Sequence, residues 1–216
     1  QALLAQGADI LDIGGESTRP NAPSVSVQEE LDRVLPVLEA LQGCGIPLSI
    51  DTRKTAVMQA AIALGVYMVN DISALEEDGA LQAVADSRVG VCLMHKQGDP
   101  STMQQAPVYI DVVQEVQDYL LARAQMAQAA GIAAQRLVLD VGFGFGKTYA
   151  HNQALFKALP RLCALPYPML VGVSRKSMLG EATGKPVQER QAASVAAALL
   201  AVQAGAAIVR VHDVDV

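Results

Sequence analysis

Short apolar runs alternate along this chain with longer segments in which apolar residues recur at helical spacing. Leu31, Val34, Leu35 and Leu38 illustrate the longer segments, because they share one face of a helix. The short runs contain Val, Ile and Leu and predict strands at residues 8–13, 47–51, 68–72, 90–95, 137–141, 169–174 and 207–212. Glycines that end a predicted helix before the next predicted strand are Gly7, Gly45, Gly65, Gly131 and Gly205.

Alternation of strands and helices predicts a parallel sheet that helices cover on both faces. Ser26 and Asp78 are the expected N-caps of two of these helices. Residues 1–216 form one α/β domain, and the favoured architecture is a (β/α)8 TIM barrel with seven of its eight strands present. A strand upstream of the first helix end would complete the barrel. An open doubly wound sheet is the alternative, and periodicity alone does not separate the two.

The amino-acid composition argues against nucleic-acid-binding and membrane-spanning proteins. The chain has 216 residues, 51% of them apolar, and a net charge of -6, which argues against a nucleic-acid partner. The apolar stretch at residues 192–209 is too mixed for a membrane span. Cys44, Cys92 and Cys163 lack metal-ligand spacing and are expected to be reduced thiols, which favours the cytoplasm.

Polar residues stand at the carboxyl end of almost every predicted strand, where barrel enzymes perform chemistry. A single residue of this kind is often a helix N-cap, and a lone histidine such as His95 is typically structural. The coincidence across seven strands predicts a small-molecule site, because carboxylates near a barrel core are costly without a ligand or a counter-charge. The strand-end residues are Asp12, Asp51, Asn70, Asp71, His95, Asp140, Ser174, Arg175, Lys176, Ser177, Arg210, His212 and Asp213.

Residues 142–147 read GFGFGK, which fits neither the P-loop nor the GxGxxG pattern. The loop either brings its backbone close to a flat ligand beside Phe143 or Phe145, or makes a tight turn with core phenylalanines. Lys176 is open to two interpretations. A Schiff-base role requires a depressed pKa, which Arg175 would favour and nearby aspartates would oppose. We therefore expect an ion-pairing or hydrogen-bonding lysine.

Seven motifs in order along the chain resemble those of the bacterial dihydropteroate synthases, a family of pterin-binding barrels. They are GADILDIGGESTRP at residues 7–20, SIDT at 49–52, VNDI at 69–72, CLMH at 92–95, DVGFGFGK at 140–147, VSRKS at 173–177 and RVHD at 210–213. Val141 stands where the family commonly has proline, which suggests a looser turn.

The resemblance implies a transferase that joins 4-aminobenzoate to a dihydropterin diphosphate in folate biosynthesis. By position, Asp51, Asn70, Asp140 and Lys176 match the pterin-binding residues, and of these Asp51, Asp140 and Lys176 are the expected catalytic groups, acting electrostatically and not as nucleophiles. Arg210 and His212 match the diphosphate ligands. Residues implied at the 4-aminobenzoate pocket are Thr18, Arg19, Pro20, Phe145 and Ser177, with Thr18 also beside the pterin diphosphate.

The resemblance also implies Mg²⁺ as a cofactor, sulfonamides as competitors of 4-aminobenzoate, and a homodimer. The asparagine that helps to hold Mg²⁺ in the family is expected in a segment before Gln1, so no residue of this chain is assigned to the metal. A final helix is expected after residue 216. Without these segments the chain is at risk of being inactive.

Three rival functions remain at this stage. A pterin-binding methyltransferase domain shares the barrel and the pterin ligands, and corrinoid dependence would favour it. A non-catalytic pterin-binding fragment would bind pterin diphosphate without releasing diphosphate. A Schiff-base aldolase would use Lys176 and would be trapped by borohydride.

Overall fold

The computed structural model describes residues 2–18, 22–98 and 102–215. Within them, a single parallel sheet runs in the order β1-β2-β3-β4-β5-β6-β7. A doubly wound sheet would reverse its order at a switch point, so the unbroken order confirms the barrel architecture. The strands are β1 (Leu11–Gly14), β2 (Leu48–Asp51), β3 (Met68–Asp71), β4 (Gly90–Met94), β5 (Leu137–Asp140), β6 (Met169–Val171) and β7 (Ile208–Val209).

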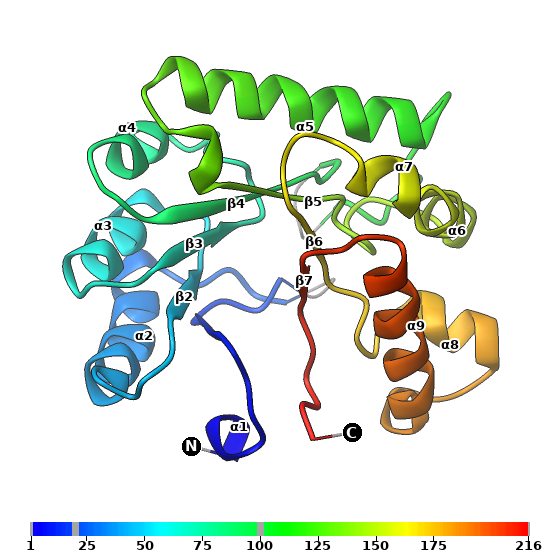
Figure 1. Cartoon of the computed structure of the whole chain (residues 1–216), viewed down its shortest axis with the longest axis horizontal. Helices are drawn as coiled ribbons and strands as arrows, with labels where there is room; N and C mark the ends of the chain where they lie inside the picture. Colours follow the sequence, from blue (N-terminus) through cyan, green and yellow to red (C-terminus); the bar gives the residue numbers. More distant parts are fainter. Residues whose placement is uncertain (1, 19–21, 99–101, 216) are drawn as a thin grey trace.

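Helices surround the curled sheet on its outer side (Figure 1). Most cross from the end of one strand to the start of the next. The α-helices are α1 (Ala2–Ala5), α2 (Val27–Leu41), α3 (Thr55–Ala63), α4 (Ala80–Ala85), α5 (Val112–Ala129), α6 (Tyr149–Lys157), α7 (Leu159–Cys163), α8 (Ser177–Thr183) and α9 (Gln191–Gln203). Short 3-10 turns cover Ala134–Arg136 and Val187–Glu189. None of the helices in the described ranges is long and apolar enough to cross a membrane.

The core lies between the sheet and its helices. Ile50, Val69 and Leu139 on the strands are fully buried, as are Leu120 on α5 and Leu155 on α6. Burying an aliphatic side chain contributes about 1.5–3 kcal/mol. This layer therefore fixes the strands, and through them the positions of the residues at their carboxyl ends.

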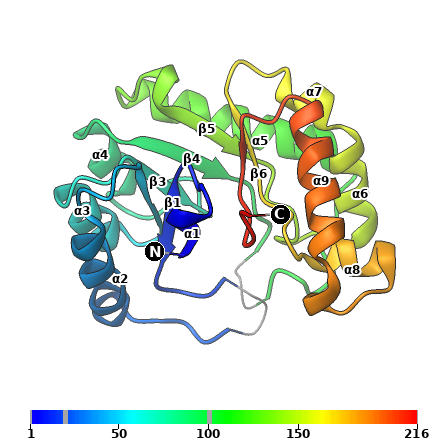
Figure 2. The same ribbon diagram turned by 60° about the horizontal axis from the view of Figure 1, so that its bottom comes forward.

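Strands β1 and β7 are the two edges of the sheet, and the two ends of the described chain lie on this side (Figure 2). Contacts between residues of the described ranges cross from one edge to the other. Gln6 before β1 donates to Asp215 after β7 at 3.0 Å. Arg210, immediately after β7, reaches Asp12 in β1 at 2.6 Å. The second contact belongs to the cluster described below.

Several sequence predictions need correction at their boundaries. The first strand begins at Leu11, because the Ala8 N–H bonds to the Leu3 carbonyl and completes the end of α1. The sixth strand ends at Val171. Beyond it the chain turns, with Arg175 in the left-handed region at φ 58°. The seventh strand is two residues long.

The N-cap predictions had mixed outcomes. Ser26 is confirmed, since its hydroxyl accepts the Glu29 N–H at 3.2 Å. Asp78 is wrong, because the N-cap of α4 is Gly79, and the carbonyl of Asp78 accepts from the Thr55 hydroxyl instead. The five predicted helix-ending glycines all have φ between 85° and 102°, a conformation that glycine adopts without strain.

Candidate active site

Four strand ends bring carboxylates, an amide and a guanidinium together. The sheet register places Asp51 of β2 beside Asn70 of β3. The Asn70 side chain donates to Asp12 at 3.0 Å. Arg210 donates to Asp12 at 2.6 Å and to Asp51 at 2.7 Å. The sequence prediction that these strand ends converge is therefore confirmed for Asp12, Asp51, Asn70 and Arg210.

Asp140 and Lys176 form the other side of the cluster. Asp140 ends β5 and accepts the Gly142 N–H at 2.8 Å. Lys176 precedes α8; its ammonium donates to the Phe143 carbonyl and lies 4.9 Å from the centre of the Phe145 ring. Lys176 is thus a hydrogen-bonding lysine, as expected from the sequence, and its cation–π contact with Phe145 is an addition that the sequence did not predict.

Burial shifts the proton affinity of these groups. Desolvation, followed by the like charge of Asp12, raises the pKa of Asp51 to about 7, although Arg210 opposes the shift. Desolvation also raises the pKa of Asp140, against the stabilising charge of Lys176. The pKa of Lys176 is lowered to about 8 by desolvation, with a contribution from Arg210. Arg210 therefore contributes to this lowering, in place of the Arg175 expected from the sequence.

Arg175 and His212 have other partners. The Arg175 guanidinium forms an ion pair with Asp213. The His212 ring lies 2.9 Å from the Ser174 hydroxyl through Nδ1, and the His212 N–H donates to the same oxygen at 3.2 Å. These contacts fix the segment that follows β7, which carries Arg210 to the cluster.

The glycine-rich loop after β5 is shaped by close packing on the chain that leaves β4. A Cβ at Gly142 would lie 2.0 Å from the His95 carbonyl oxygen, and one at Gly146 would lie 2.4 Å from that of Gln97. Both glycines have positive φ. The interpretation of a core phenylalanine is confirmed for Phe143, which is fully buried. Phe145 is half-buried beside Lys176, and a flat ligand next to it stays a prediction.

This packing predicts that Gly142→Ala is far more damaging than Gly184→Ala. Both glycines have φ near 70°, but a Cβ at Gly184 meets nothing within 4 Å. Gly184→Ala should therefore show only the left-handed penalty of about 1–2 kcal/mol, whereas Gly142→Ala adds a backbone clash. Thermal unfolding of the two variants measures the difference, and equal losses would contradict the account of the loop.

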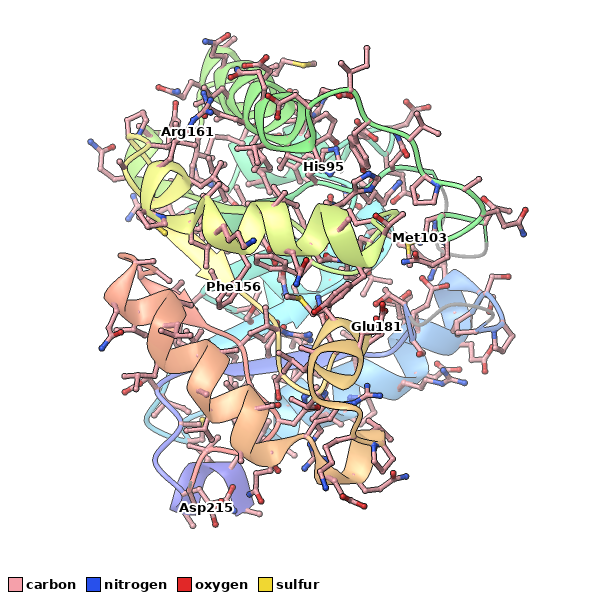
Figure 3. The ribbon with its side chains drawn as sticks, turned by 90° about the vertical axis from the view of Figure 1, so that its right-hand side faces the viewer. His95, Met103, Phe156, Arg161, Glu181 and Asp215 are labelled. Carbon is pink, nitrogen blue, oxygen red and sulfur yellow. The ribbon has the colours of Figure 1, made fainter. Side chains whose placement is uncertain are left out.

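His95 lies where β4 ends and contacts Lys147 of the glycine-rich loop, with 3.0 Å between Nδ1 and Nζ; the residue is labelled in Figure 3. Its ring packs edge-on against Tyr119 of α5. Burial, and then the charge of Lys147, lowers the pKa of His95 to about 3, so it is neutral near pH 7. The expectation of a structural histidine is confirmed.

The structure describes only some of the residues predicted for the 4-aminobenzoate pocket. Arg19 and Pro20 lie outside the described residues. Thr18 is partly buried in the loop after β1, and Ser177 is exposed at the start of α8. Among the described residues, neither hydrogen-bonds to the cluster. Their roles therefore stay predictions, while Phe145 is the member of this group that contacts Lys176.

The sequence predicted neither the partner of Asp12 nor any role for Glu16 and Lys147. Asp12 was recognised as a strand-end carboxylate, and its partner Arg210 lies almost at the other end of the chain. Glu16 accepts from Lys54 at 2.9 Å and from the Val25 N–H at 3.1 Å, so it closes the base of the loop that begins after β1. A glutamate directly after paired glycines at a strand end was the available signal.

The fold and the cluster of polar side chains at the strand ends together define an enzyme of the β/α-barrel class. Residues 1–212 match the family model described as pterin binding enzyme, and the chain belongs to that family and, within it, to the dihydropteroate synthases. The dihydropteroate synthase of Neisseria meningitidis serogroup C is 56% identical, over 99% of this chain and 77% of that protein.

Solved structures of dihydropteroate synthases share the fold. The Burkholderia cenocepacia dihydropteroate synthase, complexed with 7,8-dihydropteroate, is 56% identical with a TM-score of 0.93, over 99% of this chain and 79% of that one. The Yersinia pestis dihydropteroate synthase, in complex with a sulfonamide drug, is 49% identical with a TM-score of 0.96, over 100% of this chain and 78% of that one.

Proposed function

We propose that this chain joins 4-aminobenzoate to (7,8-dihydropterin-6-yl)methyl diphosphate, giving 7,8-dihydropteroate and diphosphate in folate biosynthesis. The convergence of Asp51, Asn70, Asp140, Lys176 and Arg210 on one strand-end face carries the proposal. The dihydropteroate bound by the Burkholderia cenocepacia relative supports it.

A pterin ring suits the donors and acceptors of this cluster. Its edge presents an amino group and a ring N–H, from which the Asp140 carboxylate can accept two parallel hydrogen bonds. Asn70 both donates and accepts, and Lys176 donates to the pterin carbonyl or a ring nitrogen. Hydrogen bonds to charged groups contribute about 1.5–3 kcal/mol each.

The reaction breaks the bond between the pterin methylene carbon and a diphosphate oxygen and forms a bond from that carbon to the amine nitrogen, which then gives up a proton. In a dissociative order, diphosphate leaves first and the methylene carbon becomes cationic. Asp51 and Asp140 stabilise that positive charge while Arg210 and His212 hold the departing anion. No covalent intermediate on the protein is required.

Mg²⁺ is part of the proposal as an ion that the diphosphate oxygens would coordinate, and it would neutralise charge on the leaving group. Within the described ranges, no three His, Cys, Asp or Glu side chains are grouped to hold a metal. Mg²⁺ sites of this kind use one or two protein ligands plus substrate phosphates. An ion bound in this way would be held mainly by the diphosphate, so Mg²⁺ stays a proposal for this chain.

Phe145 and the residues at 18–20 and 177 are the proposed walls of the 4-aminobenzoate pocket. The Phe145 ring lies beside Lys176, so an aromatic amine stacked there would be close to the pterin methylene. Sulfonamides are the proposed competitors, in line with the drug complex of the Yersinia pestis relative.

Diphosphate release by the full-length protein tests the proposal. With pterin diphosphate, Mg²⁺ and 4-aminobenzoate together we expect turnover, and little when the amine is omitted. A sulfonamide should raise the KM for 4-aminobenzoate and leave kcat unchanged. Release that ignores both the amine and the sulfonamide would contradict the proposal.

The pKa shifts predict a bell-shaped pH dependence of kcat/KM for the pterin diphosphate. The raised pKa of Asp51 means that its carboxylate forms as the pH rises through about 7. The lowered pKa of Lys176 means that its positive charge is lost as the pH rises through about 8. Activity should therefore peak between these values and fall on both sides. Lys176→Met should remove the alkaline limb, and a profile that stays flat across both values would contradict the assignment.

The rival functions have their own readouts. A methyltransferase would need a corrinoid, and a fragment that merely binds would hold pterin diphosphate without releasing diphosphate. For an aldolase, borohydride with a carbonyl substrate should label Lys176.

Two further proposals concern assembly and location. We propose a homodimer, which sedimentation would reveal, and a cytoplasmic location, which is supported by the free thiols of Cys44, Cys92 and Cys163.

A further inference from the structure

The backbone of residues 142–146 is held through its carbonyl groups. Each of the five carbonyl oxygens accepts a hydrogen bond from a side chain. The donors are Lys147 to Gly142 at 2.9 Å and to Phe145 at 3.0 Å, Lys176 to Phe143, Gln104 to Gly144, and the Tyr109 hydroxyl to Gly146 at 2.9 Å. These donors therefore help to set where Phe145 lies.

Lys147 supplies two of these bonds and also joins the loop to the end of β4. It is 3% exposed. Its ammonium lies 3.0 Å from Nδ1 of His95 and 3.3 Å from the His95 carbonyl oxygen. None of its hydrogen bonds within the described residues goes to a carboxylate. A buried ammonium that binds carbonyls and a neutral imidazole is costly, and burial lowers the pKa of Lys147 to about 7.

The two ends of the proposed active site depend on Lys147 to different degrees. Asp140 and Asn70 stand on strands whose position the core fixes. Phe145 stands in the loop, with its carbonyl bonded to Lys147 and its ring beside Lys176. Loss of the Lys147 bonds should displace Phe145 much more than it displaces the strand-end residues.

We propose that Lys147 is a positioning residue for the binding of 4-aminobenzoate. It holds the glycine-rich loop against the chain that follows β4, and this contact keeps Phe145 and Lys176 in place relative to each other. This inference rests on the proposed function and adds a residue to it. Lys147 acts through Phe145 and is not itself a group that touches substrate.

The test compares Lys147→Met with Lys157→Met in the full-length enzyme. Methionine keeps an unbranched stem and removes the donors, and Lys157 is an exposed lysine on α6. For Lys147→Met we expect the KM for 4-aminobenzoate to rise roughly tenfold or more. Affinity for 6-hydroxymethylpterin, measured by titration calorimetry, should fall by much less. Lys157→Met should match the wild type in both.

A merely structural role would lower stability and the active fraction without raising that KM, so an unchanged KM in folded Lys147→Met would overturn the proposal. If Lys147→Met does not fold, Tyr109→Phe tests the proposal instead. This variant removes one hydrogen bond to a carbonyl of the same loop and does not change the charge. It should raise the same KM by a few-fold, roughly what the loss of one hydrogen bond costs; an unchanged KM there also overturns the proposal. Inactive wild type and inactive Lys157→Met would instead count against the proposed function itself.

Discussion

Replacing Asp140 by asparagine is expected to lower kcat/KM for the pterin diphosphate by roughly 10²- to 10⁴-fold. In the proposed complex the carboxylate accepts two charge-assisted hydrogen bonds from the pterin edge, which together would contribute about 3–6 kcal/mol. An asparagine amide offers one acceptor and presents a donor to the second pterin N–H. The negative charge proposed to stabilise the cationic methylene carbon is lost as well.

Asp140→Asn also carries an internal control. The asparagine oxygen can still accept the Gly142 N–H that Asp140 accepts at 2.8 Å, so the loop should keep its shape. Asp140 raises the pKa of Lys176, and its neutralisation should move the alkaline limb of the pH profile to lower pH. Activity within about twofold of the wild type would remove Asp140 from the catalytic machinery.

Arg210→Met is expected to reduce kcat by roughly 10²- to 10³-fold, the usual effect of losing one donor to a developing anion. Arg210 is half-exposed at the cluster, where it donates to Asp12 and Asp51. It opposes the raised pKa of Asp51, so its removal should also move the acid limb of the pH profile to higher pH.

Lys185→Met is the matched control for Arg210→Met. It removes the same unit of charge from an exposed lysine that forms an ion pair with Glu189 of the same surface segment, where such pairs contribute little. Its kcat and its pH profile should match those of the wild type. If both variants lose activity to the same extent, the effect of Arg210→Met is one of net charge, and the assignment of Arg210 to the leaving group fails.

The strand-end cluster was largely predictable from the sequence. Parallel strands with carboxylates at their ends place those groups on one face of a barrel, and the structure shows Asp51 beside Asn70 on that face. The partner of Asp12 was not predictable in this way. Arg210 reaches it across the two edges of the sheet, and local pattern does not encode how far the sheet curls.

The packing of the glycine-rich loop was also not predictable from the sequence. Alternating glycines indicate a close backbone approach, but not to what, and the partner is the chain after β4. Phe143 and Phe145 occupy equivalent places in the pattern, yet one is in the core and the other faces Lys176. Lys147 matched no phosphate motif, and its role appears once the loop is packed against His95.

The most direct test of the central claim is to measure dihydropteroate and diphosphate in the same reaction, for the wild type and Asp140→Asn side by side. We predict that the wild type forms the two products in equal amounts and that both require 4-aminobenzoate. Both should fall together in Asp140→Asn, with the folded protein retained. Diphosphate without dihydropteroate, or undiminished formation of both by the variant, would contradict the assignment of this strand-end cluster as the active site.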